Sequence, residues 1–416
     1  MRDVVVIGAG LAGLAAAIKA ADAGLSVTLI TKGVGGIQLG TGTVDILGYG
    51  PDPVDRPLDA IPAHVALRPT HPYAHVSPDQ VGASVAWLRD LVGPDALVGD
   101  ETCNVRIPTG VGALRPTCLI PPSMQAGIPR AGERYAIVGL ARFKDFYPSL
   151  VAENLSRQAG PDGAPIKARA LSVDYVVRDG EVDSVGTVHA RSLDHEENRA
   201  RLAAQIRPLL EDGEIVGLPA VLGLDDPNAW RDLADKLRHP VFEIPVQPPS
   251  VPGMRLNASL TRLASAKARV VLGSPLKALH TADGRVQAVE YASAGRATRV
   301  ETRAVILAAG GFESGALEMD SYGVVRDTVC GLPVMGPTGQ LLHADFWGEE
   351  QPLFLAGLAV DDSMRVVDEN GKAVYTNLFA AGGNLAGATR WREKSGEGIA
   401  LASALAAVDA IVEELK

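Results

Sequence analysis

The chain has 416 residues, enough for two or three domains, and 47% of them are hydrophobic against 21% charged, which excludes a disordered chain or a coiled coil. Its 39 Lys and Arg face 49 Asp and Glu, a formal net charge of -10, so nucleic acid is not expected as a main partner. The three cysteines form no C-x-x-C pair, which indicates a reducing, cytoplasmic setting without disulfides or thiolate metal sites.

The first 32 residues predict a complete β-α-β unit. Residues 4–7 are fully apolar, which is typical of a strand buried on both faces in a parallel sheet. Residues 14–23 are rich in Ala and Leu and end at Gly24, a helix stop, and residues 25–30 return to strand composition.

Three glycines join the first strand to the helix in G-x-G-x-x-G spacing. In this context Gly8 permits a tight turn, Gly10 lets backbone amides approach a pyrophosphate, and Gly13 allows close helix packing. The pattern predicts a nucleotide or flavin phosphate site, although a Rossmann-like unit without a ligand would look the same. Thr31 and Lys32 stand where an acidic residue usually binds the adenosine ribose, which disfavours NAD and weakens the prediction for the adenine half of FAD.

The middle of the chain reads as an insertion into this first domain. A glycine-dense loop over residues 33–43 precedes a proline-punctuated region. The elements predicted there are a short helix at 85–92, a strand at 133–140, helices at 197–210 and 227–237, and a rigid connector at 247–253.

Strand patterns return in the last third of the chain. Residues 270–301 predict a small antiparallel meander with turns at Asp283-Gly284 and at Gly295, which feeds an apolar strand at 304–311. A second excursion covers roughly 312–375. A short strand at 377–383 and a closing helix at 398–415 complete the pattern.

These elements predict an α/β fold: a Rossmann-like FAD/NAD(P)-binding domain with an inserted α+β domain. The flavin-binding domain is assigned to residues 1–50, 250–312 and 376–416, the substrate or cap domain to 51–249, and a second insertion to 313–375. No apolar run reaches the ~20 residues that span a bilayer, so we expect any membrane association to come through a partner.

Glycine junctions follow three apolar strands, after residues 7, 307 and 381. An elongated cofactor lying across a sheet requires such a layout. The segment from Ser395 to Ile399 precedes the last helix, whose N-terminal amides would face the flavin pyrimidine edge. A glycine cap on an ordinary helix is the alternative.

Cationic residues supply candidates for substrate binding. Arg390, Arg392 and Lys394 would suit a phosphorylated or carboxylated substrate, or the charge of a flavin semiquinone, if they faced a flavin. A solvated surface loop is the alternative, as it is for Arg115, Arg142 and Lys144. His343 beside Asp345 suggests a proton relay, or else a structural histidine.

Several segments, in this order along the chain, resemble the B subunit of the anaerobic glycerol-3-phosphate dehydrogenase, within the wider flavoprotein superfamily that includes fumarate reductase flavoproteins. The segments that carry the resemblance are 4–32, 41–45, 114–117, 137–140, 248–251, 305–311, 377–382 and 395–398.

The resemblance implies a flavoprotein subunit that binds FMN, with FAD as the alternative. It also implies a larger FAD-containing A subunit and an iron-sulfur C subunit that anchors the complex to the membrane. Such a complex passes electrons from sn-glycerol 3-phosphate, oxidised to dihydroxyacetone phosphate, to quinone. The chain would then be cytoplasmic, and peripheral on the inner membrane through its partner.

Motifs and resemblance together predict catalytic roles for His343, Arg390 and Arg392, and no metal ligands. The predicted cofactor-binding residues are Gly8, Ala9, Gly10, Ala12, Gly13, Thr31, Lys32, Gly42, Thr43, Ala308, Gly310, Gly382, Asn384, Ser395, Gly396, Gly398 and Ile399. Hydride transfer would occur in this chain or in the larger flavoprotein partner. The alternatives are a self-contained flavin oxidoreductase of the fumarate reductase type and a non-catalytic flavin-binding relay or scaffold.

Overall fold

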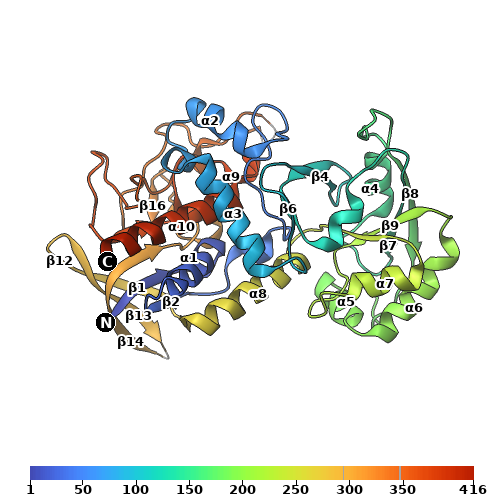
Figure 1. Cartoon of the computed structure of the whole chain (residues 1–416), viewed down its shortest axis with the longest axis horizontal. Helices are drawn as coiled ribbons and strands as arrows, with labels where there is room; N and C mark the ends of the chain where they lie inside the picture. Colours follow the sequence, from blue (N-terminus) through green and yellow to red (C-terminus); the bar gives the residue numbers. More distant parts are fainter. Residues whose placement is uncertain (294, 346–347) are drawn as a thin grey trace. The chain divides into compact units, whose positions relative to one another are not determined.

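The computed structural model describes residues 1–293, 295–345 and 348–416, and its contacts divide the chain into two compact units (Figure 1). The first unit comprises Met1–Gly36, Asp45–Leu88 and Ser259–Lys416. The second comprises Ile37–Val44 and Arg89–Ala258. Each unit has its own sheet and is described by itself.

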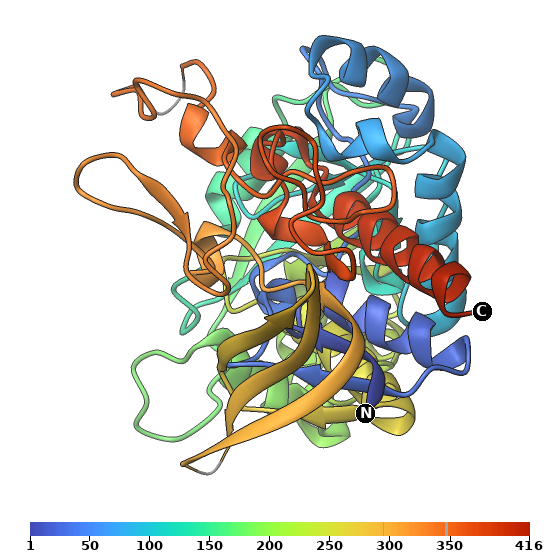
Figure 2. The same ribbon diagram turned by 90° about the vertical axis from the view of Figure 1, so that its left-hand side faces the viewer.

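A mixed sheet forms the centre of the first unit. Its parallel strands run in the order β11 (Arg269–Val271), β2 (Val27–Ile30), β1 (Arg2–Ile7), β14 (Arg296–Leu307) and β17 (Leu378–Ala380). The first half of β14 also pairs antiparallel with β13 (Arg285–Ser293), which pairs with β12 (Leu276–Ala282). The long twisted strands of this meander are prominent in Figure 2.

The register of the parallel strands aligns their carboxyl ends. Ile7 lies opposite Leu307, and Leu307 lies opposite Ala380. The apolar runs of β1 and β17 are buried, as a strand covered on both faces requires. The three glycine junctions that follow these strands therefore meet at one edge of the sheet.

Two long helices pack together on this sheet. The helices α1 (Leu11–Asp22) and α10 (Gly396–Leu415) lie side by side in Figures 1 and 2. Both are rich in Ala, and most of their residues are buried, which lets the two backbones approach each other and the strands closely. This unit also contains α2 (Pro57–Leu67), most of α3 (Pro78–Val92), the second half of α8 (Val251–Lys267), α9 (Arg390–Glu393), β15 (Leu317–Met319) and β16 (Val325–Asp327).

The second unit is built on a parallel sheet of its own, in the order β10 (Val241–Ile244), β9 (Glu214–Pro219), β7 (Arg134–Leu140) and β8 (Lys167–Val173). Figure 1 shows α4 (Pro148–Leu155) on one side of this sheet and the other helices of the unit on the opposite side. Those helices are α5 (Gly186–Leu193), α6 (Glu196–Ile206) and α7 (Ala229–Leu237). Two short antiparallel pairs join β3 (Val98–Gly99) to β6 (Leu119–Ile120) and β4 (Val105–Pro108) to β5 (Leu114–Thr117).

The α/β class is confirmed, and most predicted elements are present with shifted bounds. The first helix begins at Leu11 rather than residue 14, because Gly13 lies inside its first turn. The helix predicted over 85–92 begins at Pro78, since proline is tolerated in a first turn. The turn predicted at Gly295 adjoins residue 294, which lies outside the described residues.

Two predicted connections are wrong. Residues 270–273 are not part of the meander, because β11 pairs parallel with β2 at the edge of the sheet. The connector predicted over 247–253 ends early, since α8 (Val251–Lys267) begins inside it and accommodates Pro252 in its first turn.

The compact units also differ from the domain boundaries proposed from sequence. Residues 51–88, which were assigned to the insertion, lie in the first unit, where Tyr73 donates a hydrogen bond to the Ile46 carbonyl at 2.7 Å and packs against Gly398 of α10. Residues 37–44 and 250–258, which were assigned to the flavin-binding domain, lie in the second unit. The excursion at 313–375 belongs to the first unit. No helix in the described parts of the chain is both long and apolar enough to cross a membrane.

Candidate functional site

The first glycine junction is shaped by close packing of backbone. A Cβ atom on Gly8 would lie 2.2 Å from the Ala308 carbonyl oxygen, and Gly8 has a φ of +108°. A Cβ atom on Gly13 would lie 1.9 Å from the Gly8 carbonyl oxygen. Both positions therefore require glycine, and through them α1 packs onto the ends of β1 and β14.

The Cβ position of Gly10 at the start of α1 is open, whereas Gly35 packs closely against Ala9 and Gly10, since its Cβ atom would lie 2.4 Å from the Gly10 Cα atom. No described atom lies within 4 Å of the position that a Gly10 Cβ would take. Gly10 is also the N-cap of α1, which carries no side-chain cap and, over its described first turn, no acidic residue. Ala9 and Ala12 are buried beside it. Uncapped backbone amides at the positive end of a helix are a site that fits a phosphate.

The second and third junctions complete this edge of the sheet. A Cβ atom on Gly383 would lie 3.3 Å from the Gly310 Cα atom, and a Cβ atom on Gly382 would lie 2.8 Å from the Ala12 Cβ atom. The structure thus brings together the predicted positions around Gly8, Ala308 and Gly382.

The side chain of Asn384 lies buried at this edge, and its carbonyl oxygen receives no hydrogen bond from the described residues. The side chain is 2% exposed, and its Nδ2 donates to the Leu307 carbonyl at 2.9 Å. Its Oδ1 has no hydrogen-bond partner among the residues that the structure describes. An unpaired buried acceptor is costly, so a ligand hydroxyl or amide fits this position. The open Gly10, the uncapped α1 and Asn384 together suit an elongated cofactor that carries a phosphate and hydroxyl groups.

Other predicted residues of the first unit have different surroundings. The Thr31 hydroxyl donates to the Gly33 carbonyl at 2.5 Å, so it is engaged in a local turn, while Lys32 is exposed. The Gly398 amide donates to the Asp45 carbonyl at 2.9 Å. The Ile399 amide donates to the Ser395 carbonyl at 2.9 Å, an ordinary helical bond. At the start of α10, these two amides are therefore used within the protein.

Gly42 and Thr43 lie in the second unit. Gly42 has a φ of +77°, and its Cβ position is 2.6 Å from the Pro252 side chain. Arg115 of β5 donates from Nη1 to the hydroxyls of Thr41 and Thr43, at 3.1 Å each. The structure thus joins Thr43 to Arg115, two residues that the sequence indicated separately.

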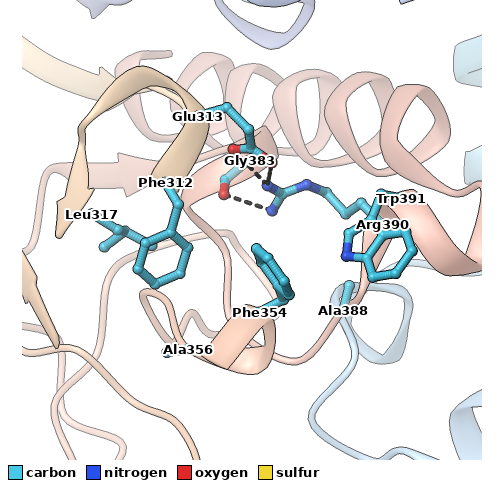
Figure 3. A pocket seen from close by; sticks show the side chains of 9 residues that line it. All are labelled: Phe312, Glu313, Leu317, Phe354, Ala356, Gly383, Ala388, Arg390 and Trp391. Carbon is cyan, nitrogen blue, oxygen red and sulfur yellow. Dashed lines mark hydrogen bonds and ion pairs between the residues drawn. The ribbon is translucent and has the colours of Figure 1, made fainter. Parts of the chain in front are cut away.

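A small pocket of about 10 Å³ surrounds Arg390, room for about one water molecule. Figure 3 shows its guanidinium reaching toward Gly383 and Glu313, with aromatic rings nearby. Arg390 donates to the Gly383 carbonyl at 2.6 Å and contacts the Glu313 carboxylate at 3.3 Å. The rings of Phe354 and Trp391 pack edge to face, 6.0 Å between centroids. Arg390 is therefore a cation held at the carboxyl ends of β14 and β17.

The other two predicted catalytic residues lie outside this pocket lining. Arg392 is exposed and donates to the Gly348 carbonyl at 3.0 Å. His343 exchanges main-chain hydrogen bonds with the Gln351 side chain, in which the His343 amide donates to Oε1 at 2.7 Å. Their catalytic roles stay predictions. Arg142 and Lys144 of the second unit are paired with Asp174 and Asp183.

Sequence reasoning missed a buried cluster of His64, His71 and Glu393. The ligand atoms of these residues lie within 4.8 Å of one another. His71 precedes Glu393 by 322 residues, so no local motif could have revealed the contact. The sequence signal was the concentration of three histidines, His64, His71 and His75, within twelve residues.

Known proteins related in sequence match nearly the whole chain. Residues 3–399 match the FAD binding domain family. A probable B subunit of anaerobic glycerol-3-phosphate dehydrogenase from Halobacterium salinarum is 33% identical, over 99% of this chain and 98% of that protein. The B subunit of the same enzyme from Yersinia pestis is 29% identical with the same coverage.

Similar solved structures include other flavoproteins. A 3-ketosteroid Δ1-dehydrogenase from Sterolibacterium denitrificans is 13% identical, covers 99% of both chains and gives a TM-score of 0.43. A quinol fumarate reductase FrdA variant from E. coli is 10% identical over 99% of this chain and 70% of its own, with a TM-score of 0.45. Because both scores are below 0.5, the family assignment rests on the sequence matches.

Proposed function

The chain belongs to the B-subunit family of anaerobic glycerol-3-phosphate dehydrogenases and to the FAD binding domain family, and on that premise we propose that it is a flavin-dependent redox subunit of such an enzyme. The complex oxidises sn-glycerol 3-phosphate to dihydroxyacetone phosphate. Its proposed partners are a flavoprotein A subunit and an iron-sulfur C subunit. The C subunit would dock this cytoplasmic chain at the membrane and pass electrons to quinone.

We propose FAD as the cofactor. The match to an FAD binding domain favours FAD over the FMN that the sequence resemblance implied. The amides at the start of α1, beside Gly10, would hold the pyrophosphate, and Asn384 Oδ1 would accept a hydrogen bond from the cofactor. Such a flavin accepts a hydride and releases electrons one at a time.

The side chains around this edge supply binding rather than redox chemistry. Arg390 offers a positive charge in an aromatic setting, with Phe312, Phe354 and Trp391 around it. A guanidinium suits a phosphate because it presents parallel N–H donors. To bind a substrate phosphate, Arg390 would exchange its contact with Glu313 for the ligand.

One observation carries the proposal: the three aligned glycine junctions meet beside an unpaired buried acceptor, Asn384. The test is anaerobic addition of glycerol 3-phosphate to the flavin-loaded chain, alone and with its partner subunits, with flavin absorbance as the readout. Bleaching in either setting supports the redox function. A bound flavin that stays oxidised in the complete complex contradicts it.

A second candidate is an electron relay that binds flavin while another subunit binds the substrate. The Arg390 pocket favours it, because it has room for about one water and its guanidinium is already paired with Glu313. In that case the isolated chain stays oxidised with glycerol 3-phosphate and is reduced only when the larger flavoprotein partner is present.

Arg390 separates the two candidates. If it binds the substrate phosphate, Arg390→Ala should raise the KM for glycerol 3-phosphate by at least tenfold, equivalent to about 1.4 kcal/mol, with flavin content unchanged. Arg326→Ala, which removes an exposed cation paired with Asp320, is the matched control. An unchanged KM in Arg390→Ala would favour the relay.

A further inference from the structure

A single buried carboxylate organises the segment between α9 and α10. Glu393 is 4% exposed and accepts hydrogen bonds at both oxygens. Arg68 donates to Oε1 at 2.9 Å and the Thr389 amide at 3.1 Å. His71 lies 3.1 Å from Oε2, and the Ser395 hydroxyl donates to the same oxygen at 3.0 Å.

The charge of this carboxylate is fixed by its donors. Burial alone would raise the pKa of Glu393, but the imidazoles of His64 and His71 and the Thr389 amide hold it far below its usual range. Arg68 also pairs with Glu350, so one guanidinium joins two carboxylates. These donors therefore favour the charged form of Glu393.

Two histidines and a glutamate this close could suit a metal ion, but the tautomer of His71 argues against one. The Tyr73 amide donates to His71 Nδ1 at 3.1 Å, so the neutral ring carries its proton on Nε2, the atom that faces Glu393. A metal-binding histidine shows the opposite arrangement, with its outer ring nitrogen donating. Burial, the largest effect, lowers the pKa of His71, which keeps the ring a neutral donor to the carboxylate.

Glu393 ties two segments together through its main chain as well. Its carbonyl accepts hydrogen bonds from the amides of Gly48 and Tyr49, at 2.9 Å each, and its amide donates to the Thr389 carbonyl at 3.0 Å within α9. Ser395, whose hydroxyl the Glu393 side chain holds, is the N-cap of α10. Breaking this tie would release the turn that carries both Arg390 and the start of α10.

We propose that Glu393, with His71 as its neutral donor, is a positioning residue that holds the α9–α10 turn in the geometry needed for flavin binding. The role rests on the proposed flavin function, because the turn borders the edge of the sheet to which the cofactor is assigned. Glu393 acts through Ser395 and α9, and it does not itself touch the cofactor.

The test compares two buried carboxylates in the full-length chain. Glu393→Gln keeps the size of the side chain and removes its charge. Glu243→Gln is the matched control, since Glu243 of the second unit is 1% exposed and bonded to Arg255 and Ser123. The FAD dissociation constant is measured by flavin fluorescence, and the midpoint potential of the bound flavin by anaerobic titration.

We expect both variants to unfold at lower temperature, because each loses a buried charge pair. Only Glu393→Gln should raise the FAD dissociation constant, by at least tenfold, and shift the midpoint potential of the bound flavin, since the turn that borders the proposed flavin site is no longer held in place. A dissociation constant within twofold of the wild type would overturn the proposal.

His71→Gln keeps the proposal testable if Glu393→Gln does not fold. It should weaken FAD binding at least threefold, whereas His75→Gln, which removes a half-buried histidine of the same segment that pairs with Asp362, should not. Equal effects of the two would overturn the proposal. So would one equivalent of zinc bound by the wild type and lost in His71→Gln, because that would make the cluster a metal site.

Hydrogen exchange separates this proposal from the flavin function. In the chain without cofactor, Glu393→Gln should increase exchange at residues 45–49 and 389–398 relative to the wild type. If wild-type protein binds no flavin, the proposed function fails even when this increase is seen. Unchanged hydrogen exchange in these two segments would show that the Glu393 side chain does not hold them in place, whether or not the protein binds flavin.

Discussion

His189 of the second unit is a buried polar side chain without a described partner. It is 0% exposed and packs against Phe143 and Tyr175, at ring centroid distances of 5.6 and 6.1 Å. Neither ring nitrogen has a hydrogen-bond partner within residues 1–293, 295–345 and 348–416. Burial lowers the pKa of His189 to about 4, from an ordinary value of 6.5.

This shift predicts an acid-sensitive second unit. Between pH 6.5 and 4 the unfolded chain binds a proton at this site that the folded chain does not, so the free energy of unfolding falls as the pH falls, by up to about 3 kcal/mol. His189→Leu should remove that part of the pH dependence. Urea unfolding of both proteins at pH 7 and pH 4.5 measures it, and parallel pH profiles would show that His189 does not contribute.

A second prediction concerns Asn384, at the edge of the sheet where the cofactor is proposed to bind. Asn384→Ala removes the unpaired acceptor and the bond to Leu307, so we expect about a tenfold weaker FAD affinity, or 1.4 kcal/mol, with the fold intact. Ser314→Ala, which removes a hydroxyl bonded to the Gly311 carbonyl nearby, is the control. Fluorescence titration that gave equal affinity for both variants would place the cofactor elsewhere.

At the scale of elements, the first helix depends on glycines for packing as well as for binding. Gly13→Ala would place a methyl group against the Gly8 carbonyl, which α1 or β1 must shift to accommodate. We expect a loss of roughly 2–4 kcal/mol in the free energy of unfolding together with loss of flavin. In Gly36→Ala, where no described atom lies within 4 Å of the new Cβ atom, thermal unfolding should change little. Equal melting temperatures for the two would refute this packing argument.

The elements that were predicted share strong local signals. The β1–α1–β2 unit combines an apolar run, a glycine motif and an Ala-rich helix, and each signal lies within a few residues. The helix α8 was missed because prolines at 248, 249 and 252 indicated a connector, whereas proline at a helix start is compatible with helix. The short strands β9 and β10 were not predicted, since brief apolar runs do not distinguish strand from buried helix.

At the scale of the whole molecule, contacts distant in sequence account for what the sequence could not show. Gly398 was expected beside the flavin, yet its Cβ position lies 2.2 Å from the Tyr73 hydroxyl, 325 residues earlier in the chain, so packing also explains the glycine. The Glu393 cluster depends on the same long-range contact between segments. Motifs predicted that the glycine junctions meet at one edge of the sheet, because the carboxyl ends of parallel strands meet by topology, whereas side-chain networks depend on tertiary packing that no local pattern records.

The most direct test of this account is the identity and amount of flavin in the purified full-length chain. The protein is purified alone, reconstituted with FAD and FMN together, washed and denatured, and the released flavin is identified and quantified by chromatography. We expect about one FAD per chain, held through the glycine edge and Asn384. A chain that retains neither flavin after reconstitution would contradict it.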